Sequence, residues 1–315
     1  MHAAVVRSFG QPPRFEEFAA PVARTPHDEV VDVIAAGLHP RVRSQADGSH
    51  YTATDELPLI PGIDGVGRRA DGSLVYFVLP DTTLGAMAER TVIDSRRSIR
   101  LPDDADPVLL AAAMNPAMSS WVALTGRITF APGQSVLVLG ATGSAGRLAI
   151  QVARHLGAGR VIAAGRGAAK LAALNADATI DLSADAAVVG REFGEKAADV
   201  DVVLDYLWGA PTERAIMPML RARAEPSRLL SWIEIGAVAG ADIALPSAAL
   251  RQANVHFLGS GQGSMSGGGI LKSLPALVDL IDRGTFSIET VTRPLREVEA
   301  AWTADTAHAR LVLTP

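Results

Sequence analysis

Between residues 133 and 260 the chain alternates short apolar runs with helical segments, and this alternation constrains the fold more than any other feature. The apolar runs are unbroken and do not alternate with polar residues, which is typical of strands buried on both faces of a parallel sheet. They are QSVLVLG, RVIAAG, VDVVLDY, RLLSWIEIG and VHFLGSG. Helical segments begin near residues 145, 168 and 211. We therefore predict a doubly wound parallel α/β domain.

A glycine-rich turn follows the first predicted strand and leads into a helix whose Leu148, Val152 and Leu156 share one face. A backbone that closely approaches a pyrophosphate excludes β-carbons, here at Gly143 and Gly146, and the helix start offers N–H groups to the anion. The spacing of the glycines, G-x-x-G-x-x-G, is by itself a weak indication of dinucleotide binding. Its position between a predicted strand and a predicted helix makes the indication stronger. The alternative is a turn that only packs the helix on the sheet. The predicted dinucleotide-binding residues are Gly140, Ala141, Thr142, Gly143, Ser144, Ala145 and Gly146.

The second predicted strand ends at Gly165 and is followed by Arg166 and Lys170. Proteins that bind NAD usually carry an acidic residue about 20 positions after the glycines, where it accepts the ribose 2′-hydroxyl. The segment 147–176 contains no Asp or Glu. Arginine can instead hold a 2′-phosphate through two parallel charge-assisted hydrogen bonds. We therefore predict NADPH as the cofactor, bound by these three residues, unless Arg166 and Lys170 are only solvated side chains.

Further cofactor contacts are predicted where the later strands end, because open α/β sheets bind ligands at the carboxyl ends of their strands. Gly236, Gly259 and Ser260 follow such strands and are assigned to the nicotinamide half of the cofactor. Tyr206 follows the strand VDVVLD, and we expect it to contact the cofactor and not to perform chemistry.

The first hundred residues contain short strands between Gly, Pro and Asp turns, with almost no helical periodicity. Asp106 followed by Pro107 then predicts a helix start, with a break at Pro116 and a second helical stretch after it. Eight of the ten residues 260–269 are Gly or Ser, which predicts a flexible loop. A helix that ends near Arg283, a strand, a short helix and a terminal strand complete the chain.

Composition excludes several classes of protein. The chain has no cysteine, which excludes disulfides, thiol nucleophiles and thiolate zinc sites. Its net charge of -5 gives no basic surface for nucleic acid. The first residues contain no apolar core of signal-peptide length, and no run of about 18 apolar residues indicates a membrane span. We therefore expect a cytoplasmic protein without nucleic-acid or membrane partners.

Together, these segments resemble the zinc-independent branch of the medium-chain dehydrogenase/reductase superfamily, and in particular its NADPH:quinone oxidoreductase-like group. The resemblance spans nearly the whole chain, and the order of its segments is more specific than any one of them. It implies a GroES-like, mostly β catalytic domain at 1–116 and 262–315, with an NADPH-binding Rossmann domain at 117–261 inserted in it. It also implies a homodimer formed through the strand VHFLGSG. The matching segments are MHAAVVRSFG, EVVDVIAAGLHP, LPLIPGIDGVG, AMAERTVID, LPDDAD, MNPAMSSWVAL, FAPGQSVLVLGATGSAG, VIAAGRGAAKL and VTRPLREVEAAW.

The chain departs from the zinc-dependent relatives, which carry a catalytic Cys after the AAG segment and a His in a G-H-E triplet. Here these segments are Leu38-His39-Pro40 and Gly62-Ile63-Asp64. His39, Asp47 and His50 offer an alternative metal site, although such polar loops are usually only solvated. We expect no metal, and hence no alcohol oxidation through a metal-bound alkoxide. Reduction of a quinone or an α,β-unsaturated carbonyl leaves a delocalised anion that hydrogen bonds can stabilise, so we expect such a substrate in the cleft between the domains.

Tyr51 is the predicted catalytic residue, because related enoyl-thioester reductases carry a tyrosine in this region that resembles their proton donor; alternatively it only lines the cleft. Asn115 and Ser119 occupy positions that face the nicotinamide or the phosphates in similar proteins, although helix capping explains a serine equally well. Two other functions stay open. An enoyl-thioester reductase needs basic residues for a carrier phosphate, and only Arg41 and Arg43 lie near Tyr51. The other is a non-catalytic NADPH-binding protein.

Overall fold

The computed structural model describes residues 1–306 and 308–315, which divide into two compact units. The first unit comprises Met1–Asn115 and Leu271–Pro315, and the second comprises Pro116–Ile270. The second unit is thus inserted in the first along the chain. The chain passes between the units at 115/116 and 270/271, where the sequence predicted 116/117 and 261/262.

The second unit is built on a six-stranded parallel sheet with the order β10-β9-β8-β11-β12-β13. In chain order, β9 and β10 are added on one side of β8, and β11, β12 and β13 are then added on its other side. This order confirms the predicted doubly wound α/β fold. The strands are β8 (Ser135–Leu139), β9 (Arg160–Gly165), β10 (Ala178–Asp181), β11 (Val202–Asp205), β12 (Leu230–Glu234) and β13 (Val255–Gly259).

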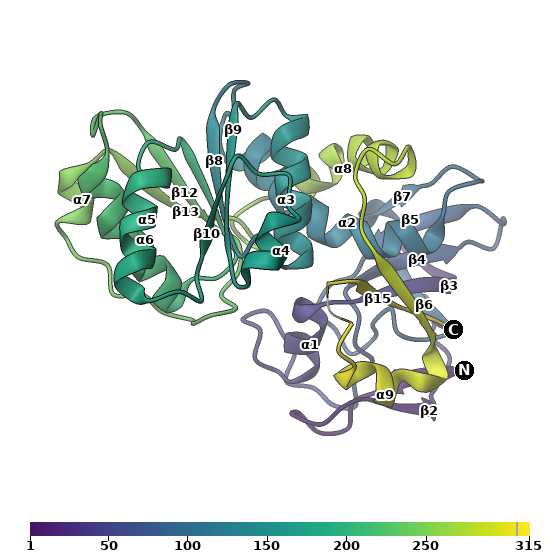
Figure 1. Ribbon diagram of the computed structural model, residues 1–315. Coiled ribbons are helices and arrows are strands. Elements are labelled where there is room, and N and C mark those ends of the chain that lie inside the picture. The colour runs from purple at the N-terminus through teal and green to yellow at the C-terminus, as the bar shows by residue number, and fades with distance from the viewer. Residues whose placement is uncertain (307) are drawn as a thin grey trace. The chain divides into compact units, whose positions relative to one another are not determined.

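Apolar side chains of this sheet are buried on both faces. Leu137 and Ile162 pack in one cluster with Phe193 of α5, and the intervening Val136 and Val138 are buried outside that cluster. Helices α5 and α6, which supply much of this cluster, lie side by side in Figure 1. The helices are α3 (Ser144–His155), α4 (Ala168–Ala172), α5 (Ala186–Ala197), α6 (Gly209–Ala222) and α7 (Ala249–Gln252).

The strand β10 and the helix α5 are absent from the predicted order of elements, in which the strand at 200–206 follows the helix near 168. Only Ile180 of the four strand residues is buried, because β10 lies at the edge of the sheet. Such a strand shows no apolar run in the sequence. The omission matters because β10 places Asp181 in register with Gly165 at the end of β9.

The first unit is mostly β, as predicted. Its larger sheet has the order β14-β15-β3-β4-β5-β7, and β6 also pairs with β3. The long strand β3 therefore joins strands from both ends of the chain. The strands are β1 (His2–Val5), β2 (Arg14–Glu17), β3 (Asp28–Leu38), β4 (Asp64–Arg68), β5 (Leu74–Val78), β6 (Arg90–Asp94), β7 (Ser98–Arg100), β14 (Thr290–Pro294) and β15 (Arg310–Thr314). Short helices are η1 (Ser95–Arg97), α1 (Pro40–Ala46), η3 (Leu295–Glu297) and α9 (Val298–Thr303).

The helix α2 (Pro107–Val122) begins as predicted, since the Asp106 carboxylate accepts hydrogen bonds from the amides of Val108 at 2.9 Å and Leu109 at 3.1 Å. The predicted break at Pro116 is wrong. A proline inside a helix costs about 3 kcal/mol, but the apolar residues on both sides of it, such as Met114 and Ala117, are fully buried and offset that cost.

The helix continues from α2 as a π-helical turn, η2 (Ala123–Arg127). Among the described residues, the stretch 107–127 is the one helix long and apolar enough to cross a membrane by length and composition. Its most apolar part is 67% buried within the protein, as in a core helix of a soluble domain.

The Gly/Ser-rich segment 260–269 is more structured than predicted, because α8 (Gly267–Asp282) begins inside it. The Arg127 guanidinium donates to the carbonyl of Gly259 at 2.8 Å, and the Gly261 amide donates to the Ser264 hydroxyl at 2.8 Å. After α8, Gly284 has a φ of +71°, the left-handed conformation expected of a glycine after a helix end.

Candidate functional site

The glycine-rich turn between β8 and α3 is fixed to the neighbouring strand β9. The amides of Gly140 and Ala141 both donate to the carbonyl of Ala164, at 2.9 and 3.0 Å. Gly140 has a φ of +89°, which favours glycine. Gly143 is the N-cap residue of α3, and no side chain caps this helix start. A helix start that no side chain caps fits the phosphates of a dinucleotide.

The two glycines singled out in this turn have different surroundings. A β-carbon at Gly146 would lie 2.3 Å from the Gly140 carbonyl oxygen and 2.6 Å from the Ala141 α-carbon. The protein's own backbone therefore requires glycine at position 146. A β-carbon at Gly143 would meet only the Gly140 carbonyl oxygen, at 3.5 Å, which is ordinary van der Waals contact. Any requirement for glycine at position 143 must then come from a ligand.

Ser119 and Tyr206, both predicted to contact the cofactor, lie together in the second unit. Their hydroxyl oxygens are 2.9 Å apart, and Ser119 donates to the carbonyl of Pro116 at 2.7 Å. Because Ser119 has one hydroxyl proton, Tyr206 is the donor between them. Burial raises the pKa of Tyr206 to about 12, so its hydroxyl stays protonated at neutral pH.

Two predicted glycines adjoin this tyrosine. A β-carbon at Gly140 would lie 3.2 Å from the β-carbon of Tyr206, and one at Gly236 would lie 3.5 Å from the Tyr206 carbonyl oxygen. Ser119, Gly140, Tyr206 and Gly236 therefore gather at the carboxyl edge of the sheet. Ser260 is tied to the same edge, since its amide donates to the Glu234 carbonyl at 2.8 Å. Asn115 is the last residue of the first unit before the insertion.

The end of β9 packs directly on the glycine-rich turn. A β-carbon at Gly165 would lie 2.8 Å from the Thr142 side chain, so glycine is needed there for this contact. Arg166 and Lys170 follow and are exposed. Neither forms an ion pair with any residue in 1–306 or 308–315. Two cationic side chains beside the turn are thus available to a ligand.

Asp205 was not predicted from the sequence, although it organises the same edge. Its buried carboxylate accepts hydrogen bonds from the amides of Leu207 and Trp208, at 2.9 and 3.0 Å. It also accepts from the side chains of Thr212 at 2.6 Å and Trp232 at 3.0 Å. These bonds hold the segment after Tyr206 in place. An acidic residue at the end of an otherwise apolar strand was the available signal.

Tyr51 lies in the first unit, on the loop after α1, and its side chain is 72% exposed. Its ring packs on that of His50, with centroids 4.3 Å apart. Thr52 anchors this loop, because its hydroxyl donates to Asp81 at 2.6 Å and accepts from Arg41 at 2.8 Å. The predicted proton donor is therefore an exposed tyrosine on a loop that Thr52 anchors.

A buried polar network occupies the segments that carry metal ligands in the zinc-dependent relatives. The Asp64 carboxylate lies 3.2 Å from the His39 ring nitrogen Nε2 and accepts from the Tyr76 hydroxyl at 2.8 Å. All three side chains are at most 3% exposed. Burial lowers the pKa of His39, so the ring is neutral at pH 7. His39, Asp47 and His50 form no metal-binding group, and no such group of three is found in residues 1–306 and 308–315.

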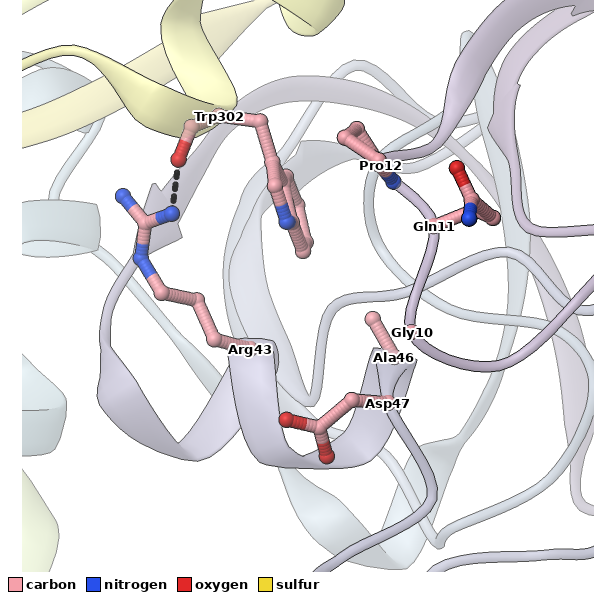
Figure 2. A pocket seen from close by; sticks show the side chains of 7 residues that line it. All are labelled: Gly10, Gln11, Pro12, Arg43, Ala46, Asp47 and Trp302. Carbon is pink, nitrogen blue, oxygen red and sulfur yellow. Dashed lines mark hydrogen bonds between the residues drawn. The ribbon is translucent and has the colours of Figure 1, made fainter.

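A small pocket of about 280 Å³ lies elsewhere in the first unit, and Figure 2 shows its lining. The Arg43 guanidinium donates to the carbonyl of Trp302 and lies 5.4 Å from the centroid of the Trp302 ring. Arg43 therefore links α1 to α9. The lining residues are Gly10, Gln11, Pro12, Arg43, Ala46, Asp47 and Trp302.

Comparisons with known proteins agree with this arrangement. A probable NADPH-dependent quinone reductase of Emericella nidulans is 30% identical over an alignment of 359 positions, gaps included, which covers 100% of both chains. This chain belongs to the quinone oxidoreductase family of medium-chain dehydrogenases/reductases. The family predicted from the sequence is therefore confirmed. No model of a protein family matches the chain.

Other members of the family share the fold. A quinone oxidoreductase from Thermus thermophilus superposes with a TM-score of 0.81 at 25% identity, over 100% of both chains. The quinone oxidoreductase of Escherichia coli, solved with NADPH, gives a TM-score of 0.82 at 18% identity, also over 100% of both chains. An NADPH-dependent alkenal/one oxidoreductase of Arabidopsis thaliana is 28% identical over 171 residues, 48% of this chain and 44% of that protein.

Proposed function

We propose that this protein is an NADPH-dependent oxidoreductase that transfers hydride to a quinone or an α,β-unsaturated carbonyl. The observation that carries the proposal is the uncapped start of α3 beside Arg166 and Lys170, two exposed cations that no side chain of the described residues neutralises. The full-length likeness to an NADPH-dependent quinone reductase supports the same cofactor and the same class of reaction.

NADPH, when bound, supplies the hydride. The start of α3 would hold the pyrophosphate, and Arg166 and Lys170 would hold the 2′-phosphate. Ser119 and Tyr206, fixed to each other at 2.9 Å, would contact the nicotinamide half. An enone gains the hydride at its β-carbon and becomes an enolate, and a quinone gains the same two electrons and one hydrogen and becomes a hydroquinone anion. Either anion then takes one proton at oxygen, and the enol formed from an enone tautomerises to the saturated carbonyl. We assign that proton to the hydroxyl of Tyr51, which solvent would then restore.

Arg166→Ala should weaken NADPH binding by about 10- to 100-fold, because one or two charge-assisted hydrogen bonds to the 2′-phosphate are lost. NADH binding should stay nearly unchanged, since NADH lacks that phosphate. Titration of nicotinamide fluorescence with both coenzymes measures the two affinities. Arg191→Ala, which removes an exposed arginine of α5, is the matched control. Equal weakening of both coenzymes would show that Arg166 does not hold the 2′-phosphate.

Tyr51→Phe should reduce turnover of enones by about 10- to 100-fold while leaving NADPH affinity unchanged, because the variant loses only the proton-donating hydroxyl. The assay follows NADPH oxidation by its absorbance over a panel of quinones and enones. Phe retains the ring that packs on His50. Unchanged turnover on every acceptor would remove Tyr51 from the mechanism, and no NADPH oxidation by the unmodified protein would contradict the proposed activity itself.

The two alternative functions are less well supported. An enoyl-thioester reductase would use Arg41 and Arg43 for a carrier phosphate, but Arg41 is paired with Asp81 at 2.5 Å and Arg43 is bound to Trp302. Neither guanidinium is therefore a free phosphate ligand. A non-catalytic NADPH-binding role predicts binding without turnover, which the acceptor panel distinguishes.

Three further properties belong to the proposal. We propose catalysis without zinc, supported by the absence of cysteine and by the buried Asp64 network at the segments where relatives carry metal ligands. We propose a homodimer formed through β13, supported by the position of this partly exposed strand at one edge of the sheet. We also propose a cytoplasmic location, in line with the expectation from the sequence.

A further inference from the structure

A carboxylate lies beside the turn that carries Arg166, although the segment 147–176 contains no acidic residue. It belongs to Asp181, at the end of the edge strand β10, in register with Gly165. Its Oδ1 atom accepts a hydrogen bond from the Gly167 amide at 3.1 Å. The structure thus places an acidic group next to the residues assigned to a 2′-phosphate, where charge alone would disfavour that phosphate.

The Asp181 carboxylate accepts several hydrogen bonds from nearby residues. The same Oδ1 atom accepts from the Ser183 amide at 3.0 Å and from the Ser183 hydroxyl at 2.5 Å. Together with bonds from the amides of Gly167 and Ala168, these donors lower the pKa of Asp181, so the group is ionised at neutral pH. The carboxylate is therefore surrounded by donors that offset its charge.

The bond from the Gly167 amide ties the turn to β10. Gly167 has a φ of +94°, a backbone conformation that favours glycine. Because glycine has no side chain, contacts from elsewhere must hold the backbone in this conformation. Gly167 precedes the five-residue helix α4, and no side chain of its own caps that helix. Asp181, from the neighbouring strand β10, instead holds the N-cap residue itself through the Gly167 amide. Without it, the backbone that directs Arg166 would lose its anchor.

We propose that Asp181 is a positioning residue that sets the preference for NADPH over NADH by fixing the turn at Arg166–Ala168. This inference rests on the proposed binding of NADPH. Because Asp181 occupies the Gly167 amide, a 2′-phosphate would be held by the Arg166 and Lys170 side chains. If the turn is already fixed, Arg166 loses less conformational entropy when it binds the 2′-phosphate. This smaller entropy cost favours NADPH and not NADH, because only NADPH carries the 2′-phosphate.

Two variants separate positioning from charge repulsion. Asp181→Ala removes the acceptor and the charge, whereas Asp181→Asn removes the charge and keeps an oxygen that accepts from the same amides. If Asp181 positions the turn, Asp181→Ala should lower the ratio of NADPH to NADH affinity by about five- to tenfold, the effect of about one lost hydrogen bond. Asp181→Asn should keep the ratio within about threefold of the unmodified protein.

The experiment titrates the unmodified protein, both variants and a control with NADPH and NADH by fluorescence. Asp185→Ala is the matched control, because Asp185 caps α5 by accepting from the Ala187 amide at 2.8 Å and lies four positions further along the chain. The control should leave the ratio unchanged. Amide hydrogen exchange gives a second readout that needs no coenzyme: Gly167 and Ala168 should exchange faster in Asp181→Ala and not in Asp185→Ala.

The outcomes are distinct. A ratio that rises in both Asp181 variants would show repulsion and overturn the proposal. An unchanged ratio in Asp181→Ala would overturn it as well, as would equal losses for both coenzymes. If the unmodified protein bound neither coenzyme, the proposed function would fail first, while the exchange measurement would still report whether Asp181 fixes the turn.

Discussion

Gly146→Ala should abolish measurable NADPH binding and lower the free energy of unfolding. The added β-carbon would lie 2.3 Å from one backbone atom and 2.6 Å from another, both in the glycine-rich turn. Backbone atoms cannot rotate away as side chains do, so α3 must move off the turn. Such overpacking costs about 1–3 kcal/mol, and the shift moves the helix start away from the phosphates it would bind. We expect a loss of affinity of at least about 100-fold.

Gly143→Ala is the informative comparison, because the chain has room for a β-carbon there. Gly143 has a φ of -80°, which alanine also adopts, and the nearest atom would be 3.5 Å away. The stability of this variant should change by less than about 1 kcal/mol, while NADPH affinity falls if a phosphate contacts the backbone at this position. Urea denaturation and coenzyme titration measure the two effects. Equal destabilisation by both substitutions would contradict the geometry described for Gly146.

The parallel sheet could be predicted from the sequence because its central strands are buried on both faces and appear as unbroken apolar runs. The same criterion failed at β10, where Ile180 alone is buried and the strand lies at the edge. A second local rule, that proline ends a helix, failed at Pro116, because the burial of Met114 and Ala117 on either side outweighs this tendency of proline. Local sequence patterns therefore predicted the strands whose buried residues form an apolar run. They missed the edge strand and the continuous helix, which depend on tertiary packing.

The candidate site shows the same division. The glycine-rich turn and Arg166 could be found because strand, turn and helix are contiguous in the sequence. The bond between Ser119 and Tyr206 joins residues 87 positions apart, and no spacing rule predicts it. Asp181 was missed for a related reason. The segment 147–176, which follows the glycine-rich turn along the chain, contains no acidic residue, whereas parallel pairing of β10 with β9 brings the Asp181 carboxylate next to Gly165.

Asp64→Asn should lower the free energy of unfolding by about 3 kcal/mol, although the two side chains have nearly the same shape. Asp64 is 1% exposed and is the acidic group that favours the charged form of Arg310, a residue that is itself 6% exposed. Burial lowers the pKa of Arg310 to about 10, so the guanidinium keeps its charge at pH 7. Asp64 and Arg310 form no ion pair within residues 1–306 and 308–315, so the carboxylate acts on the guanidinium through its electric field, and removing it weakens the stabilisation of that buried charge.

A double-mutant cycle with Arg310→Met tests this explanation by urea denaturation. If the two buried charges compensate each other, the double variant should recover most of the stability lost in Asp64→Asn, because it no longer buries an unpaired charge. Asp71→Asn serves as the control, since Asp71 accepts from Ser73 near the surface and should cost less than about 1 kcal/mol. Additive losses in the double variant would show that Asp64 stabilises the unit through its hydrogen bonds to His39 and Tyr76 alone. In either case the carboxylate performs a structural task in the buried polar network that it forms with His39 and Tyr76.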